Sequence, residues 1–287
     1  MTELLYITVW ISNGNIKKLF ISKLNYRKIN GLKHFDIVLF DLGKTLLYFH
    51  GDSQEVFLKG KQRLFITLKK KLPRLDATQF LLEFDHSIQA YYLERDEGYV
   101  EYTTYKILER CLEDSGYPHV PPKLLHKALE GMYSFSERFW HPAEDTIPTL
   151  KILKKQGYKI GVISNAGDAK NAHRLIDRNN LSRYMDFILI SAEIGVRKPA
   201  PLIYKMALDH LGASPQDAVM VGDTLRADIL GAQQVGMAAI WITRQADTPQ
   251  NNEDRLTILP DASIYALKEL PYLISNWPNQ VTNHLTA

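Results

Sequence analysis

The stretch FDIVLFDLGKT, residues 35–45, decides the fold because it joins an apolar strand to a polar turn. Its apolar run, residues 35–40, is short and partly β-branched, which predicts a strand. Asp41 follows at the carboxyl end of that strand, and Gly43 and Lys44 continue into the turn. In open α/β sheets, ligands bind beyond the carboxyl ends of the strands, so this turn is the first place to look for chemistry.

Further short apolar runs repeat this pattern along the chain, with helical segments between the later ones. Continuous apolar runs without alternation suit strands that are buried on both faces, so they predict a parallel sheet covered by helices. The predicted fold class is α/β, with a Rossmann-like sheet core and helices on both faces. The predicted strands are residues 35–40, 158–164, 187–191, 218–222 and 238–243, and the predicted helices include residues 200–212 and 225–236.

A long segment after the first strand interrupts this alternation. It contains four helical segments with Gly and Pro at the joints and no convincing strand, which predicts an inserted all-α cap above the carboxyl edge of the sheet. Asn13-Gly14 between two apolar runs favours a β-hairpin near the N-terminus. The predicted division of the chain is an N-terminal extension at 1–30, a core at 31–49 and 142–275, a cap at 50–141 and a loose polar tail at 276–287.

Composition indicates a globular protein and argues against several functions. The 287 residues are 45% hydrophobic and 23% charged, which is ordinary for soluble domains. The net charge is +3, and the basic excess lies in residues 1–34, so a nucleic-acid-binding body is not expected. No apolar run approaches the ~20 residues that span a bilayer, and the single Cys111 favours a reducing compartment. We expect a cytoplasmic monomer or homodimer with no nucleic-acid or membrane partner.

Polar side chains gather where the predicted strands end. Taken singly, each has an ordinary structural explanation as a helix cap, a turn residue or a solvated surface residue. Parallel topology, however, brings these separated positions to one edge of the sheet. Three carboxylates without His or Cys favour Mg²⁺, and a Lys and a Ser beside the cation would bind phosphate. The constellation, which predicts phosphoryl transfer, is Asp41, Ser164, Asn165, Lys198, Asp223 and Asp228.

Four short motifs in this set resemble those of the haloacid dehalogenase-like (HAD) hydrolase superfamily. The resemblance covers roughly residues 33–275, and GDTLRADILGA is its most specific piece. The helical insert is similar to the C1-type cap of subclass I, which implies a small phosphorylated substrate enclosed under a mobile lid. The motifs, in order, are FDLGKT with Asp41 and Thr45, VISN with Ser164, RKP with Lys198, and VGDTLRAD with Asp223 and Asp228.

The resemblance implies a role for each matched residue. Asp41 would be the nucleophile that forms an aspartyl-phosphate, with Ser164 and Lys198 as its catalytic partners. The phosphate would be bound by Ser164, Asn165, Lys198 and Thr45. The Mg²⁺ ligands would be Asp41, the backbone carbonyl of Gly43, Asp223 and Asp228, with Asp228 either binding the cation directly or holding a metal-bound water.

Gly43 departs from the family pattern, in which phosphatases usually carry a second aspartate that protonates the leaving group and then activates water. A positioned acid or base contributes ~10²- to 10⁴-fold to a rate, and glycine supplies none of it. Lys44, where a small residue is common, is expected to face solvent. An acid from the cap could substitute, with Glu97, Glu101 and His50 as candidates, although surface charge is the simpler explanation for each.

Four functions remain open at this point. A Mg²⁺-dependent phosphatase ranks first, and a catalytically weak relative that binds a phosphorylated ligand or a partner ranks second. A phosphonatase-like hydrolase would need a Schiff-base lysine from the cap, and nothing singles out one of Lys59, Lys61 and Lys106. Dehalogenation requires no metal, so the Asp223 and Asp228 pair argues against it. Tyr99, Tyr102 and Tyr105 could line a substrate pocket, but their helical spacing is more typical of a packed lid.

Overall fold

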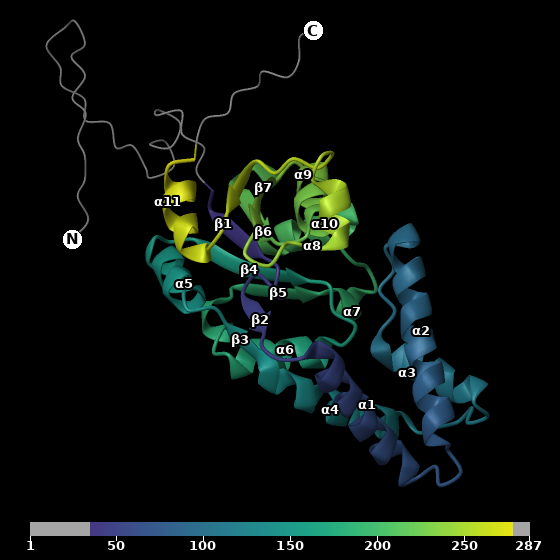
Figure 1. The fold of residues 1–287 in the computed structure, drawn as a ribbon. Coiled ribbons are helices and arrows are strands. Elements are labelled where there is room, and N and C mark those ends of the chain that lie inside the picture. Colours follow the sequence, from purple (N-terminus) through teal and green to yellow (C-terminus); the bar gives the residue numbers. More distant parts are fainter. Residues whose placement is uncertain (1–34, 278–287) are drawn as a thin grey trace, which may run out of the picture. The chain divides into compact units, whose positions relative to one another are not determined.

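A six-stranded parallel sheet forms the centre of the computed structural model, which describes residues 35–277 except for the side chains of Asp96 and Glu97. Its strand order is β5-β4-β1-β6-β7-β8 (Figure 1). The α/β prediction is confirmed, and all five predicted strands are present within one or two residues of their expected bounds. The strands are β1 (Ile37–Phe40), β4 (Lys159–Ser164), β5 (Phe187–Ile190), β6 (Ala218–Gly222), β7 (Ala238–Ile242) and β8 (Ala262–Ile264).

Strand β1 lies between β4 and β6, and every one of its four residues is buried. Phe40 is in register with Val162 of β4 and Val221 of β6, so the three strands end at the same level. Asp41 continues the β1–β6 pairing, because its N–H donates to the Val221 carbonyl at 2.9 Å. The carboxyl ends of three neighbouring strands therefore meet at one edge, where the strand order reverses.

Helices cover this sheet as the sequence pattern predicts. One core cluster joins alternate residues of β1 and β6 to α8, η5 and α9, while α5 contacts β4. Pro201 at the start of α8 and Gly212 after its end match the usual helix boundaries. The core helices are α5 (Thr146–Lys155), α6 (Ala169–Arg178), α7 (Ser191–Ile194), α8 (Pro201–Leu211), the π-helix η5 (Leu225–Leu230), α9 (Gly231–Gln234) and α10 (Pro249–Asp254); α11 (Leu270–Ser275) follows near the end of the described residues.

Two short strands, which the sequence analysis missed, mark where the chain leaves the core and returns. Strands β2 (Leu47–Phe49) and β3 (Trp140–Pro142) pair antiparallel in a separate two-stranded sheet. The expectation of no strand up to residue 141 is therefore wrong at its C-terminal boundary. Three-residue strands carry too little periodicity to be recognised, and the same applies to β8.

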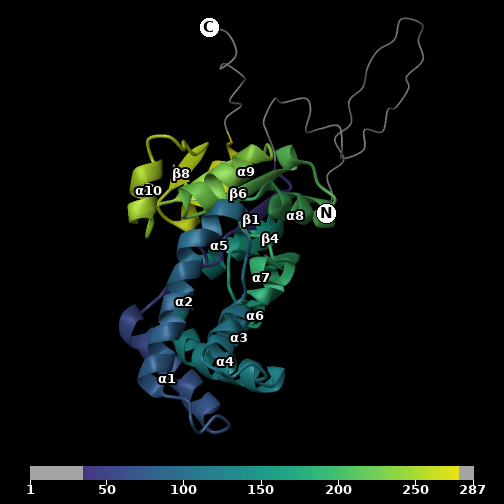
Figure 2. The ribbon, with the colours of Figure 1, turned by 90° about the vertical axis from the view of Figure 1, so that its right-hand side faces the viewer.

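Four helices occupy the segment between β2 and β3, and Figures 1 and 2 both show them gathered to one side of the sheet. Their buried residues form a second core cluster that includes Leu64, Phe84 and Leu108. Side chains of Asp52, Asp76 and Thr103 cap the first three helices by accepting from a backbone N–H. The helices are α1 (Ser53–Lys69), α2 (Ala77–Gly98), α3 (Thr104–Asp114) and α4 (Pro122–Ser136), followed by the 3₁₀ turn η2 (Glu137–Phe139).

Residues 35–271 form one compact unit that contains both the sheet and the four-helix segment. The predicted N-terminal hairpin and most of the predicted loose tail lie outside the described residues. Within residues 35–277, every helix is too short or too polar to cross a lipid bilayer. The short 3₁₀ turns of the core are η3 (Ser182–Tyr184), η4 (Pro215–Asp217) and η6 (Leu267–Glu269).

Candidate active site

Lys198 links two carboxylates at the carboxyl edge of the sheet. Its Nζ donates to Asp41 Oδ1 at 2.7 Å and to Asp228 Oδ1 at 2.6 Å. The lysine is only 2% exposed, so its ammonium is removed from bulk water and held by these charged partners. Positions 41, 198 and 228, which are far apart in the sequence, thus meet at one point, as the strand-end argument predicts.

Asp223 completes a cluster of three carboxylates with Asp41 and Asp228. One oxygen from each of these residues lies within 4.8 Å of the other two. Asp223 and Asp228 are buried, whereas Asp41 is half-buried. Carboxylate oxygens at this spacing fit a hard divalent cation such as Mg²⁺, which prefers oxygen ligands.

The electrostatics of the cluster show the cost of burying so much negative charge. Burial raises the pKa of Asp41 to about 6; Lys198 opposes this rise, and the negative charge of Asp228 adds to it. Burial also raises the pKa of Asp223 well above its ordinary value, and the neighbouring Asp41 and Asp228 add to that rise. The pKa of Lys198 is raised in spite of its burial, because both carboxylates favour the ammonium. Additional positive charge in this crevice would stabilise the ionised carboxylates.

Backbone contacts hold Lys198 and Asp228 in place. The Asn165 side chain accepts from the Lys198 N–H at 2.8 Å and donates to the Lys198 carbonyl at 2.9 Å. The Thr224 N–H donates to Asp228 Oδ2 at 2.9 Å. A Cβ added at Gly222 would lie 2.2 Å from the Asp228 carboxyl carbon, so only glycine lets this carboxylate approach the strand end.

The remaining predicted phosphate ligands lie in different surroundings. Ser164 and Asn165 line the cavity that contains Asp41, Lys198 and Asp223. The Asn165 carboxamide is already hydrogen-bonded to the Lys198 backbone, so it holds the segment that carries Lys198 in place. Thr45 is fully buried, its hydroxyl has no hydrogen-bond partner in the part of the chain that the structure describes, and it does not line this cavity. Its part in phosphate binding stays a prediction.

Lys44 does not simply face solvent, as the sequence analysis expected. It is half-buried, it lines the carboxylate cavity, and its positive charge lowers the pKa of Asp223. Its backbone has φ 55° and its N–H donates to the Leu47 carbonyl at 2.7 Å, which closes the turn after β1. The backbone conformation of this turn therefore directs the Lys44 side chain toward the carboxylates of the cavity.

Trp140 occupies the space beside Gly43. A Cβ at position 43 would lie 3.6 Å from Cη2 and 3.7 Å from Cζ3 of the indole, which is ordinary van der Waals contact. The indole belongs to β3, which pairs with β2 just beyond the turn. Trp140 therefore lies directly beside position 43 and still leaves room there for a Cβ, a contact that the sequence does not indicate.

Of the three candidate cap residues, His50 and Glu101 do not line the carboxylate cavity. His50 is exposed and does not line it. The side chain of Glu97 lies outside the described part of the chain. Glu101 is buried rather than on the surface, so the simpler explanation proposed for it is wrong. Its carboxylate accepts from the Tyr91 hydroxyl at 2.6 Å and from Ser191 Oγ at 2.8 Å.

The candidate Schiff-base lysines are each paired with a carboxylate. Lys59 pairs with Glu55 at 2.5 Å and Lys106 with Glu109 at 2.7 Å, both on exposed helix surfaces. Lys61 pairs with Asp85 at 2.5 Å. None of the three lysines lines the carboxylate cavity, so the phosphonatase alternative gains no support.

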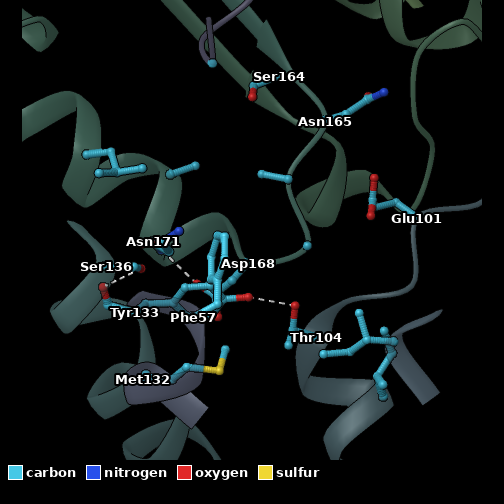
Figure 3. A pocket seen from close by; sticks show the side chains of 18 of the residues that line it. Phe57, Glu101, Thr104, Met132, Tyr133, Ser136, Ser164, Asn165, Asp168 and Asn171 are labelled. Atoms are coloured by element: carbon cyan, nitrogen blue, oxygen red, sulfur yellow. Dashed lines mark hydrogen bonds between the residues drawn. The ribbon is translucent and has the colours of Figure 1, made fainter. Parts of the chain in front are cut away.

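A second, larger cavity of about 500 Å³ adjoins the first, between the four-helix segment and the sheet edge. Figure 3 shows it lined by Thr104 and Tyr133 from the helices and by Ser164 and Asp168 from the core. Tyr102 also lines it, whereas Tyr105 packs against the core of the helical segment and Tyr99 does not line the cavity.

Arg197, which the sequence analysis passed over, is buried beside Lys198 and lines both cavities. Its N–H donates to the Tyr99 carbonyl at 3.0 Å, and its Nε lies 3.8 Å from Glu101 Oε2. The Glu101 N–H in turn donates to the Gly195 carbonyl at 3.0 Å. The arginine directly before the motif lysine was the available signal, but its partners Tyr99 and Glu101, in the connection between α2 and α3, are far away in sequence.

Comparisons with known proteins find a matching family and similar structures. Residues 38–242 match the family described as haloacid dehalogenase-like hydrolase. A 2-haloacid dehalogenase of Pseudomonas syringae pv. Tomato DC3000 is similar in structure, with a TM-score of 0.63 and 26% identity. That alignment covers 85% of this chain and all of the dehalogenase.

Two curated relatives are named for phosphate-ester chemistry. A glyceraldehyde 3-phosphate phosphatase of Methanopyrus kandleri is 36% identical over 152 residues, 52% of this chain and 63% of the relative. The pyrimidine 5'-nucleotidase YjjG of Escherichia coli is 37% identical over 244 residues, 84% of this chain and 98% of the relative. The chain thus spans less than two thirds of the first relative and nearly all of the second.

Proposed function

This chain belongs to the haloacid dehalogenase-like hydrolases, and from that premise we propose that it is a phosphatase, which transfers a phosphoryl group from a small phosphorylated metabolite to water. The observation that carries the proposal is the contact of Lys198 with Asp41 and Asp228, beside Asp223. It supplies a nucleophile, a cation for the phosphate and a metal-binding carboxylate pair in one crevice.

In the first step, a carboxylate oxygen of Asp41 attacks phosphorus while the bond to the leaving oxygen breaks, giving an aspartyl-phosphate. Lys198, already within hydrogen-bond distance of Asp41, offsets the charge of the phosphate. Ser164 at the end of β4 donates its hydroxyl hydrogen to a phosphate oxygen. In the second step, water attacks phosphorus, phosphate leaves and the Asp41 carboxylate is restored.

We propose that the residues which hold Mg²⁺ are Asp41, Asp223, Asp228 and the backbone carbonyl of Gly43. The oxygen-only donor set and its 4.8 Å spread support this assignment. When bound, the cation supplies positive charge that stabilises the carboxylates and the phosphate together. Asp228 already accepts from Lys198 and from the Thr224 N–H, one bond on each oxygen. These bonds fix the orientation of the Asp228 carboxylate, and they favour Asp223 and Asp41 over Asp228 as the main carboxylate ligands of the cation.

The absence of an acid at position 43 sets the expected substrate reactivity. Gly43 has no carboxyl group that could protonate the leaving oxygen, and the neighbouring Trp140 indole supplies none. Acyl and aryl phosphates, whose leaving groups depart without a proton, are therefore expected to react much faster than alkyl phosphates, because a missing acid costs ~10²- to 10⁴-fold.

Rates measured with Mg²⁺ across esters of graded leaving-group acidity test this proposal. A steep dependence is the expected result, and a flat one would show that another residue acts as the acid. The alternative of a non-catalytic binder predicts phosphate binding without turnover of any ester, acetyl phosphate included. The two curated relatives are named for a triose phosphate and for pyrimidine nucleotides, so their names leave the substrate of this chain open.

A further inference from the structure

The two cavities of the site are continuous in a way that constrains the substrate. Gly43, Trp140 and Ser164 line both of them. If the phosphate lies against Asp41 and Lys198, as the proposed function requires, the rest of the molecule must extend past Trp140 into the larger cavity. The lining of that cavity therefore selects the alcohol that is released.

Size and surface come first. A volume of about 500 Å³ lies within the ~300–1,000 Å³ that is usual for drug-sized ligands, and a three-carbon alcohol would leave most of it unfilled. Six aromatic side chains contribute to its walls, and Trp140 lies at the junction with the carboxylate cavity. Rings of this kind favour a planar, stacked partner. The aromatic lining residues are Phe57, Tyr91, Tyr92, Tyr102, Tyr133 and Trp140.

Charge excludes a second anionic group at the far end. Two of the cationic residues that line the larger cavity, Arg95 and Arg197, also line the carboxylate cavity and lie on the phosphate side. The third, Lys61, is held by Asp85 at 2.5 Å. Among the described lining residues, the carboxylates of Asp85, Glu101 and Asp168 equal these cations in number. A carboxylate or second phosphate here would lose its water without gaining excess positive charge.

Asn171 provides a specific polar contact. Its Oδ1 is buried and has no hydrogen-bond partner within residues 35–277, although the residue lines the cavity. Figure 3 places Asn171 near Asp168 and Tyr133; the Asn171 backbone N–H donates to Asp168 Oδ1 at 2.7 Å, and the Tyr133 hydroxyl donates to Thr104 at 2.7 Å. A buried acceptor without a donor is costly, so a ligand N–H is the natural partner of this carboxamide.

We infer that the natural substrate, given the proposed function, is the monophosphate of an uncharged alcohol of roughly nucleoside size that carries a planar ring with an N–H donor. The ring packs against Trp140 and its aromatic neighbours, and the donor binds Asn171 Oδ1. Trp140 and Asn171 are then specificity-determining residues, because the contacts proposed for them are with the ring and its donor.

A matched pair of esters isolates the ring. Uridine 5'-monophosphate and ribose 5-phosphate share the same primary ester, so the missing acid at position 43 slows both alike. With Mg²⁺, kcat/KM for the nucleotide is expected to be at least ~5-fold higher, the lower end of what stacking of a base on an aromatic side chain contributes. Trp140→Ala and Asn171→Leu are each expected to lower this ratio. Tyr272→Ala, at an exposed aromatic residue that lines neither cavity, serves as the control and keeps it.

The outcomes separate this inference from the proposed function. Acetyl phosphate, which has no ring and needs no acid, reports phosphatase chemistry alone. Its hydrolysis together with equal kcat/KM for the two ribose esters would overturn the inference and leave the phosphatase standing. Lack of turnover of acetyl phosphate and of both esters would overturn the two together. A nucleotide preference unchanged in both variants, or a preference for fructose 1,6-bisphosphate over fructose 6-phosphate, would also contradict the inference.

Discussion

The carboxylate crevice and the four-helix segment of this molecule handle charge in opposite ways. The crevice buries three carboxylates around Lys198, and burial raises the pKa of Asp41 to about 6. The helical segment buries apolar side chains and leaves pairs such as Lys106–Glu109 near the surface, where an ion pair contributes little. Buried charge is thus concentrated in the crevice, where the reaction is proposed to occur. Apolar packing is concentrated in the helical segment, which lines the cavity proposed to select the substrate.

The largest expected effect is the loss of activity in Asp41→Asn, since the amide cannot attack phosphorus. We expect turnover of acetyl phosphate to fall by at least ~10⁴-fold, as for other lost nucleophiles. Steady-state phosphate release with Mg²⁺ measures it. Asp209→Asn, which makes the same change on the exposed face of α8, is the control. Undiminished turnover in Asp41→Asn would show that Asp41 is not the nucleophile and that the reaction does not take place in this crevice.

A large effect on stability is expected in the helical segment. Phe84 is fully buried and stacks on Phe80 with ring centroids 5.9 Å apart. Phe84→Ala should lower the free energy of unfolding by about 3–5 kcal/mol, through lost burial and the cavity left behind. Leu82→Ala, at a 55% exposed position of the same helix, should change it by less than about 0.5 kcal/mol. Urea unfolding compares them, and equal losses would contradict the assigned core.

Gly43→Asp tests whether the carboxylate crevice lacks only an acid at position 43. The added Cβ fits at van der Waals distance from Trp140, and its carboxyl group restores an acid beside the leaving oxygen. Hydrolysis of alkyl phosphates should rise by on the order of 10²- to 10³-fold. Gly43→Asn has nearly the same shape without the acid and should give no such gain. Equal rates in the two variants would mean that position 43 cannot serve as the acid in this fold.

A smaller effect concerns Cys111 in the core of the helical segment. Burial raises the pKa of its thiol from 9.0 to about 11, with Glu83 adding to the rise. Because the thiolate is the reactive form, it should be ~10²-fold less populated near pH 8 than in an ordinary thiol, and labelling should accelerate up to about pH 11. Alkylation rates of the folded protein across this range measure it. Rapid labelling at pH 8 would show that the helical core opens.

The sequence predicted the parts of the site that follow from strand ends. Asp41, Ser164 and Asp223 come directly after buried apolar runs, and parallel topology requires such positions to share an edge. It did not predict Trp140 beside Gly43 or the buried Glu101, because both contacts join segments that are distant along the chain. Side-chain packing between separate elements leaves no periodic signal in a single sequence.

The most direct test of the account is to look for a phosphoryl group on Asp41. Without an acid at position 43, water activation is impaired as well, so the aspartyl-phosphate should accumulate when the enzyme is mixed with Mg²⁺ and acetyl phosphate and quenched in acid. Peptide mass spectrometry should then find the phosphoryl group on Asp41. Hydrolysis that proceeds with no phosphorylated Asp41, or with the group on another residue, would contradict the account.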